Sequence, residues 1–390
     1  MMKYNFDELI DRHNTNAYKL ELCKKVFGST DLLPLWVADM DFRTPDFILD
    51  AIKKRCEHPI LGYTVQSDVF YDDLQKWLLN QHNWKVEKQH MGFLGGIVPG
   101  IAYAVNALTN PDEEILVQTP VYPPFFTTPM HNGRKILFNQ LIEKDGLYEM
   151  DFEGLESLIT DKTKLMILCN PHNPGGRVWD KETLLKIAQI CHKHGIIVVS
   201  DEIHSDMCLK GYNHIPFASV SDEASSCSIT FVAPTKTFNM PGLASSAYII
   251  SNSDLRARFF DFLYKMEQTV TLNPITMAAT HAAYSLGEEW RRQMLDYVEA
   301  NLDYVISEMA VKMPLIKPMR PQASFLLWLD FSAYGLSSNE LQLKIVNEAK
   351  LALNKGTSFG LGGEQYFRMN VATPRSVLEE AIMRLGKVFA

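Results

Sequence analysis

Five short runs of apolar residues, each followed within two residues by a polar residue or a proline, constrain the fold of this chain more than any other feature. Within each run the apolar residues are continuous rather than alternating with polar ones, which is typical of strands covered on both faces. A helix is expected over Lys181–His194, ending at Gly195. The pattern predicts an α/β fold with a mainly parallel sheet covered by helices. The expected strands span residues 114–118, 164–169, 196–200, 228–232 and 247–251.

The C-terminal third has a different pattern, in which strands and helices are fewer and more widely spaced. Helices are expected over residues 288–313, 341–349 and 376–388, and strands over residues 322–330 and 367–371. This order predicts a smaller α+β domain. The first 45 residues are rich in loops and are expected to pack on that domain or on a partner subunit. We therefore expect a large domain over residues 46–285 and a small domain formed by residues 1–45 and 286–390.

Charge and composition narrow the classes of function. The net charge is −8 at pH 7 without a block of Lys and Arg, so nucleic-acid binding is not expected. The sequence contains no run of about 18 apolar residues, and no membrane span is expected. Six scattered cysteines form no CxxC pair, and the histidines form no HExxH motif, so neither a disulfide framework nor a metal site is expected. The expected location is the cytoplasm.

Polar residues follow three of the expected strands. Asn170-Pro171-His172-Asn173-Pro174-Gly175-Gly176 follows the second strand, Asp201-Glu202-Ile203-His204 the third, and Lys236 lies just after the fourth. Ligands of open α/β sheets bind at the carboxyl ends of the strands. We therefore expect an amide, a carboxylate and a lysine at one edge of the sheet. The Asn173–Pro174 bond is expected to be cis, as in many tight sites.

These residue types fit the chemistry of pyridoxal 5′-phosphate. Lys236 supplies an amine for the aldehyde, and Asp201 supplies a buried carboxylate that keeps the ring nitrogen protonated. Asn173 can donate to the 3′-oxygen of the ring. Gly96 and Ile97 precede an apolar helix whose N-terminal N–H groups can bind the phosphate. Tyr122 is a candidate to stack on the ring.

Several motifs resemble the class I/II aminotransferase group of fold type I pyridoxal-phosphate enzymes. They are Asn-Pro-His-Asn-Pro-Gly-Gly, Asp-Glu-Ile-His and Thr-Lys-Thr-Phe-Asn, and the resemblance covers nearly the whole chain. Further motifs resemble the C–S β-lyase (cystathionine β-lyase) branch of that group. These are Leu35–Phe42, Gly62-Tyr63, Asp201–Asp206 and Phe367-Arg368-Met369-Asn370.

The resemblance implies roles for residues in these motifs. Arg368 would hold the α-carboxylate of the substrate in a bidentate fork. Trp36 and Ala38 would lie near the substrate entrance, and Asn173 and Tyr122 would also contact the substrate. Tyr63 would reach across a dimer interface to the cofactor phosphate of the partner, which implies a homodimer with shared active sites.

Two positions depart from the pattern of the aminotransferases. Transaminating relatives usually have a tyrosine at the position of His204, where it donates to the 3′-oxygen of the cofactor, and we rank His204 below Asn173 for that contact. Many relatives have a phosphate-binding serine at the position of Ala233. Thr235, or with less support Thr237, is expected to replace it.

By this resemblance the expected reaction is α,β-elimination from cystathionine, cysteine or a related sulfur-containing amino acid, giving a thiol, pyruvate and ammonia. Lys236 would remove the Cα proton, and Tyr122 would assist proton movement at the sulfur. The alternative is an aminotransferase of class I/II, which would use the same cofactor residues. A second alternative is a non-enzymatic binder that kept the cofactor fold.

Overall fold

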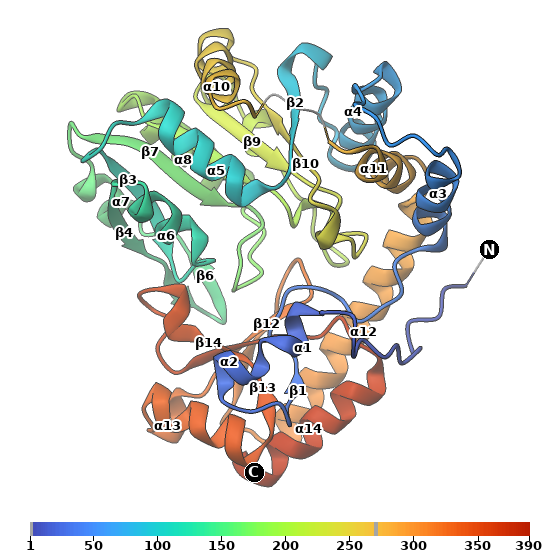
Figure 1. Ribbon diagram of the computed structural model, residues 1–390. Coiled ribbons are helices and arrows are strands. Elements are labelled where there is room, and N and C mark those ends of the chain that lie inside the picture. Colours follow the sequence, from blue (N-terminus) through green and yellow to red (C-terminus); the bar gives the residue numbers. More distant parts are fainter. Residues whose placement is uncertain (1–2, 269–271) are drawn as a thin grey trace.

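The computed structural model describes residues 3–268 and 272–390, and its largest element is a seven-stranded sheet (Figure 1). Five neighbouring strands run parallel, whereas β10 is antiparallel to both β9 and β2. The α/β fold with a mainly parallel sheet is therefore confirmed. In spatial order the strands are β2 (Met91–Leu94), β10 (Ser246–Ile249), β9 (Ser228–Val232), β8 (Ile197–Asp201), β7 (Thr163–Cys169), β3 (Glu114–Thr119) and β4 (Lys135–Gln140).

Helices cover both faces of this sheet, which explains the continuous apolar runs. Successive residues of β7 alternate between two hydrophobic clusters: Ile167 belongs to one and Leu168 to the other, and each is 1% exposed. A strand buried on both faces has no solvent side on which polar residues could alternate. One face packs on α5 (Ile97–Leu108), α6 (Pro124–His131) and α10 (Ser253–Lys265), and the other on α7 (Phe152–Leu158), α8 (Lys181–Lys193) and α9 (Asp222–Ser226).

The fifth expected strand differs from the observed one in position, and its direction was not predicted. It was expected over residues 247–251, but β10 spans Ser246–Ile249 and pairs antiparallel with its neighbours. An apolar run indicates burial on both faces and carries no information about strand polarity, which depends on the partner strands. The sheet edges β2 and β4 were not predicted, because β2 has four residues and β4 is mostly half-buried.

The C-terminal part contains a separate four-stranded antiparallel sheet, backed by the long helices α12 (Glu288–Lys312) and α14 (Arg375–Phe389). The expected strand from Gln322 begins later, because residues 322–324 bond instead to the loops at Gly176 and Met207. The expected helix 341–349 is α-helical over Ser338–Leu343 (α13) and continues as a π-helical turn. The strands are β11 (Lys317–Met319), β12 (Leu326–Asp330), β15 (Tyr366–Asn370) and β14 (Asn354–Lys355).

The N-terminal segment lies against this C-terminal part (Figure 1). The short strand β1 (Leu33–Pro34) pairs in parallel with β13 (Leu351–Ala352). Between β1 and α3 (Asp46–Glu57), residues 35–42 bond to both parts of the molecule: Asn370 N donates to Leu35 O at 2.8 Å, and Met40 N donates to Asn239 Oδ1 at 3.0 Å. The two-domain division at residues 45/46 and 285/286 stays a prediction.

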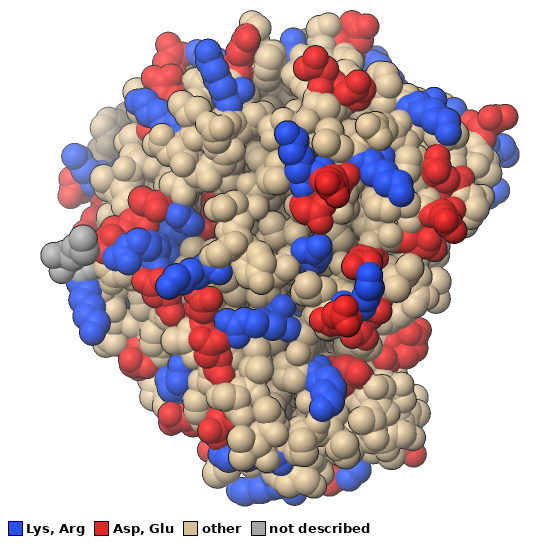
Figure 2. All heavy atoms as spheres, turned by 180° about the vertical axis from the view of Figure 1, so that it is seen from behind, with Lys and Arg blue, Asp and Glu red and all other residues tan. Residues whose placement is uncertain are grey.

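Charged residues of both signs are interspersed over the face shown in Figure 2. Within residues 3–268 and 272–390, no helix is long and apolar enough to cross a membrane. The same described residues contain no group of three or more His, Cys, Asp or Glu side chains placed to hold a metal ion.

Candidate active site

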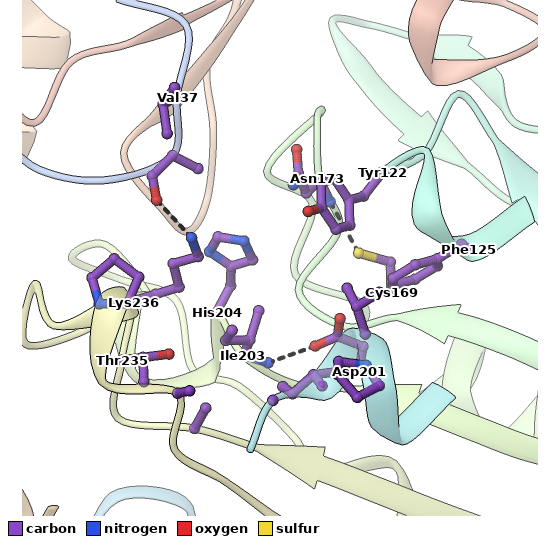
Figure 3. Close-up of a pocket in the computed structure, with 18 of the residues that line it drawn as sticks. Val37, Tyr122, Phe125, Cys169, Asn173, Asp201, Ile203, His204, Thr235 and Lys236 are labelled. Carbon is purple, nitrogen blue, oxygen red and sulfur yellow. Dashed lines mark hydrogen bonds between the residues drawn. The ribbon is translucent and has the colours of Figure 1, made fainter. Parts of the chain in front are cut away.

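A cavity of about 430 Å³ lies at the carboxyl ends of β7 and β8, bordered by the N-terminal segment and by β15 (Figure 3). The sheet edge therefore brings together most of the residues that the sequence singled out. Tyr63 does not lie in the wall of this cavity, and its side chain is fully exposed. The predicted residues found in the wall are Trp36, Ala38, Gly96, Ile97, Tyr122, Asn173, Asp201, His204, Thr235, Lys236 and Arg368.

Lys236 reaches the cavity from the loop after β9. Its Nζ donates a hydrogen bond of 2.7 Å to the main-chain oxygen of Ala38, so the lysine bridges the sheet and the N-terminal segment. Burial lowers the pKa of Lys236 to about 8, although the negative charge of Asp39 opposes this shift. Near neutral pH a useful fraction of this amine is therefore uncharged, as a nucleophile or a base requires.

Asp201 is the last residue of β8 and is buried in the cavity wall. Its Oδ1 accepts a hydrogen bond of 3.0 Å from the main-chain N–H of Ile203. Burial raises the pKa of Asp201 to about 7, and the charge of Glu202 adds to the rise. A cationic partner stabilises the ionised form of such a buried carboxyl group, because the ion pair offsets the free-energy cost of a lone buried charge.

Arg368 lies on β15 and is held by groups from three parts of the chain. Its Nη1 donates to Asn173 Oδ1, and its Nη2 donates to Trp36 O and Asn354 Oδ1, each at 3.0 Å. The guanidinium also lies 5.1 Å from the ring centre of Phe359. Burial lowers the pKa of Arg368 to about 10, which leaves it charged at neutral pH. Its Nε is buried and has no hydrogen-bond partner among the described residues.

Asn173 and Tyr122 lie together on one wall of the cavity (Figure 3). The Asn173–Pro174 bond is cis, so this prediction is confirmed. Tyr122 N donates to Asn173 O at 3.1 Å, and Asn173 N donates to Cys169 Sγ at 3.3 Å. Burial raises the pKa of Tyr122, so its phenol stays protonated at neutral pH. The pair thus offers an amide and a phenol to a bound molecule.

His204 contributes a neutral imidazole to the wall, because burial lowers its pKa to about 3. Its Nδ1 is buried, and no described residue bonds to it. Of the two threonines beside the lysine, Thr235 lines the cavity, whereas Thr237 is fully buried outside the wall. Ser245 also lines the cavity and accepts a hydrogen bond of 2.8 Å from the hydroxyl of Thr280.

One end of the cavity is formed by the start of α5. Gly95 and Gly96 precede this 12-residue helix, and its first residues Ile97 and Val98 line the wall. The first N–H groups of a helix lack intrahelical partners and bind anions well. A helix N-terminus, a carboxylate, a lysine and the amide of Asn173 therefore border one cavity. This set fits the phosphate, the ring nitrogen, the aldehyde and the polar ring substituent of pyridoxal 5′-phosphate.

Several residues of the wall were missed by sequence reasoning. Asn354 belongs to a two-residue strand and Tyr18 to a four-residue helix, so neither follows a recognisable strand end. Cys169 is the last residue of β7, where it is buried in the core and also lines the cavity. For Cys169 the available signal was its position as the last residue of an apolar run, directly before Asn170. The other missed residues of the wall are Val37, Val98, Pro99, Phe125, Ile203, Pro241, Ala244 and Ser245.

The fold and the cavity together are those of an α/β protein with a buried lysine and a buried aspartate in one cavity at the strand ends of its main sheet. The chain belongs to the class I and II aminotransferase family, whose model ("Aminotransferase class I and II") matches residues 30–385. The resemblance of the motifs is therefore confirmed.

Relatives with assigned names point to one branch of this family. The chain is 44% identical to cystathionine beta-lyase PatB of Bacillus subtilis, over 98% of both chains. The structure of cystalysin from Treponema denticola, which contains pyridoxal 5′-phosphate, matches with a TM-score of 0.95 and 33% identity over 99% of both chains. The C-S lyase from Staphylococcus hominis, solved with the same cofactor bound, matches with a TM-score of 0.92 and 33% identity, over 100% of this chain and 99% of that one.

Proposed function

We propose that this chain is a pyridoxal-phosphate-dependent C–S β-lyase that acts on sulfur-containing amino acids. The reaction converts R–S–CH2–CH(NH3⁺)–CO2⁻ and water into R–SH, pyruvate and ammonium. The observation that carries the proposal is the convergence of Lys236, Asp201 and Arg368 on one cavity, in a chain similar to C–S lyases over its whole length.

The cofactor would be held by groups from four elements. When bound, it supplies an electron sink for the pair of electrons left at Cα. Asp201 would pair with the ring nitrogen, and Lys236 would bind the aldehyde carbon. The start of α5 at Gly96 and Ile97, together with Thr235, would hold the phosphate. Asn173 Oδ1 accepts a hydrogen bond from Arg368, which leaves the amide Nδ2 to donate to the 3′-oxygen.

Two side chains would transfer protons, Lys236 as a base and Tyr122 as an acid. The lowered pKa of Lys236 provides a neutral amine that can accept the Cα proton. The raised pKa of Tyr122 keeps a phenolic proton available, which the leaving sulfur can take as the C–S bond breaks. The amino group and carbons that remain are released as an unsaturated amine, which water hydrolyses to pyruvate and ammonium.

Arg368 is the proposed partner of the substrate α-carboxylate, and its replacement gives a first prediction. In Arg368→Lys the charge remains but the planar fork is lost, and with it one charge-assisted hydrogen bond of about 1.5 to 3 kcal/mol. We expect KM for the amino acid to rise roughly 10- to 100-fold, with cofactor binding retained. Steady-state kinetics and a cofactor titration check this. A KM equal to that of the wild type would contradict the role.

The proposed reaction is tested by product analysis with and without an amino-group acceptor. Purified enzyme is incubated with cystathionine, cysteine or an S-substituted cysteine, and pyruvate, ammonium and thiol are measured. Release of all three without a 2-oxo acid is the expected result. Turnover that requires a 2-oxo acid and gives no thiol would instead identify the alternative, an aminotransferase of the same family. The relative rates define the preferred sulfur substrate.

We also propose a homodimer in which each subunit completes the site of the other. Residues 59–66 form neither helix nor strand and expose Ile60, Leu61, Tyr63 and Val65. An exposed apolar segment of this kind is typical of a surface that another chain covers. In the dimer, Tyr63 would reach the cofactor phosphate of the partner subunit.

The shared site gives a second prediction, because two inactive variants should complement one another. Tyr63→Ala and Lys236→Ala are each expected to be nearly inactive. After the subunits are mixed and exchanged, half of the dimers carry one native site. We expect activity of about a quarter of the wild-type value under this symmetry. Activity that stays at the level of the unmixed variants would contradict a site shared between subunits.

A further inference from the structure

A cluster of buried ionisable side chains lies next to Asp201 but outside the cavity wall. It consists of Glu202, His214, His82 and Asp206, and we call it the Glu202 cluster. Glu202 directly follows Asp201, at the end of β8. The proposed reaction assigns no task to these four residues, although buried charges are costly and need a physical account.

Glu202 is held by three hydrogen bonds. Its Oε1 accepts from Ser200 Oγ at 2.9 Å and from Phe217 N at 2.8 Å. Its Oε2 lies 2.7 Å from Nε2 of His214. Donors placed around both oxygens stabilise the ionised form of a carboxyl group. The Glu202 carboxylate is therefore held in one position beside its neighbour Asp201.

His214 does not cancel the charge of the Glu202 carboxylate. Its Nδ1 is buried and has no hydrogen-bond partner within residues 3–268 and 272–390. A proton on Nδ1 would be a buried donor without an acceptor, which costs free energy. Burial also lowers the pKa of His214. The ring is therefore neutral, with its one proton on Nε2 and donated to Glu202.

The other half of the cluster has its own partners. Asp206 Oδ1 lies 2.9 Å from His82 Nε2 and accepts from Trp77 Nε1 at 2.9 Å. Arg291 Nη1 donates to the main-chain oxygen of Asp206 at 3.0 Å. The rings of His82 and His214 meet edge to face at 5.1 Å.

The ionisable groups around Asp201 come from several elements. Cys169 lies opposite Asp201 on the neighbouring strand β7, and Lys236 and Tyr122 line the same cavity. Cys208 follows Asp206 by two residues and lies outside the cluster. Besides burial, the negative charge of Glu202 raises the pKa of Asp201, whereas the hydrogen bond from Ile203 and the positive charge of Lys236 lower it.

We propose that Glu202 is a positioning residue. Its buried charge raises the affinity of the pair formed by Asp201 and the cofactor ring nitrogen for the proton that they share. This inference rests on the proposed function. The physical reason is that a fixed negative charge raises the proton affinity of a nearby group. The same effect contributes to the raised pKa of Asp201 in the chain without cofactor. Glu202 thereby extends to higher pH the range in which the ring stays protonated.

The test is a titration of apoenzyme with pyridoxal 5′-phosphate over a series of pH values, read by tryptophan fluorescence and by the visible absorbance. In Glu202→Gln the side chain keeps its size and loses its charge. We expect the alkaline pH midpoint at which cofactor affinity falls to move down by about 0.5 to 1 pH unit. The matched control is Glu223→Gln, the same exchange at an exposed position, with an unchanged midpoint expected.

A second variant protects the test against misfolding of the first. His214→Asn leaves the charge of Glu202 in place but removes the imidazole donor at 2.7 Å, so the carboxylate holds its charge less well. A smaller shift in the same direction is expected. If both variants bound the cofactor more weakly at every pH but kept the wild-type pH midpoint, the inference would be overturned and the role of Glu202 would be structural. Wild-type enzyme that binds no cofactor would overturn the proposed function as well.

Discussion

Replacing Lys236 by alanine is expected to abolish the visible absorbance band of the bound cofactor and to lower turnover by on the order of 10⁴-fold. Both losses have one cause, because the same amine would bind the aldehyde and accept the Cα proton. In the structure its Nζ is placed by the main-chain oxygen of Ala38, and its pKa of about 8 provides the neutral form. Absorbance spectra and pyruvate release measure the two effects separately.

A lysine elsewhere on the surface gives the control for this experiment. Lys193 lies in the last turn of α8, and its exposed side chain is 3.5 Å from Glu156. Lys193→Ala should keep the spectrum and the turnover of the wild type, since surface ion pairs contribute little to stability. A Lys236→Ala enzyme that retained both the band and the activity would remove the basis of the proposed mechanism.

Replacing Asp201 by alanine is expected to weaken cofactor binding strongly and to lower turnover by on the order of 10²-fold or more. Without this carboxylate, a ring nitrogen that carries a proton would be a buried cation without a partner. Titration of the apoenzyme with pyridoxal 5′-phosphate measures the first effect, and pyruvate release at saturating cofactor measures the second.

The pH dependence of Asp201 strengthens this test. Since its pKa is raised to about 7 without cofactor, the free carboxyl is protonated below that pH and must lose its proton to pair with a cationic ring. A partner cation favours the ionised form and moves the pKa down again. Cofactor affinity of the wild type should therefore fall as the pH drops below neutrality, whereas Asp201→Ala should lack this dependence. Wild-type turnover in the variant would overturn the assigned role.

Much of the large sheet could be predicted from the sequence because strands buried on both faces leave a clear pattern. The run from Ser228 to Val232 coincides with β9, and the runs at β3 and β7 differ from the strands by one residue at one end. The run at β8 is shifted by one residue relative to the strand. The residues after these strands were predictable as a site because parallel strands end at the same edge. Strand polarity was not predictable for β10, since apolar residues pair equally well in either direction.

The substrate side of the site depended on family resemblance rather than on local pattern. Arg368 meets Asn173 and Trp36, which lie 195 and 332 residues away in the chain. No local spacing records such a contact. Asn354 could not be found for the same reason, because a two-residue strand carries almost no periodicity. The role of Tyr63 depends on a second subunit and stays a prediction.

Residues 36–39 bind their neighbours mainly through main-chain oxygens. Trp36 O accepts from Arg368, Ala38 O accepts from Lys236, and Val37 O and Asp39 O accept from the amide of Asn370. A point mutation cannot delete a carbonyl group, so these contacts tolerate a change of side chain. The deletion of one residue, by contrast, would shift every carbonyl by one position and misalign the lysine and the arginine together. The number of residues in this segment therefore matters more for the positions of Lys236 and Arg368 than the identity of its side chains does.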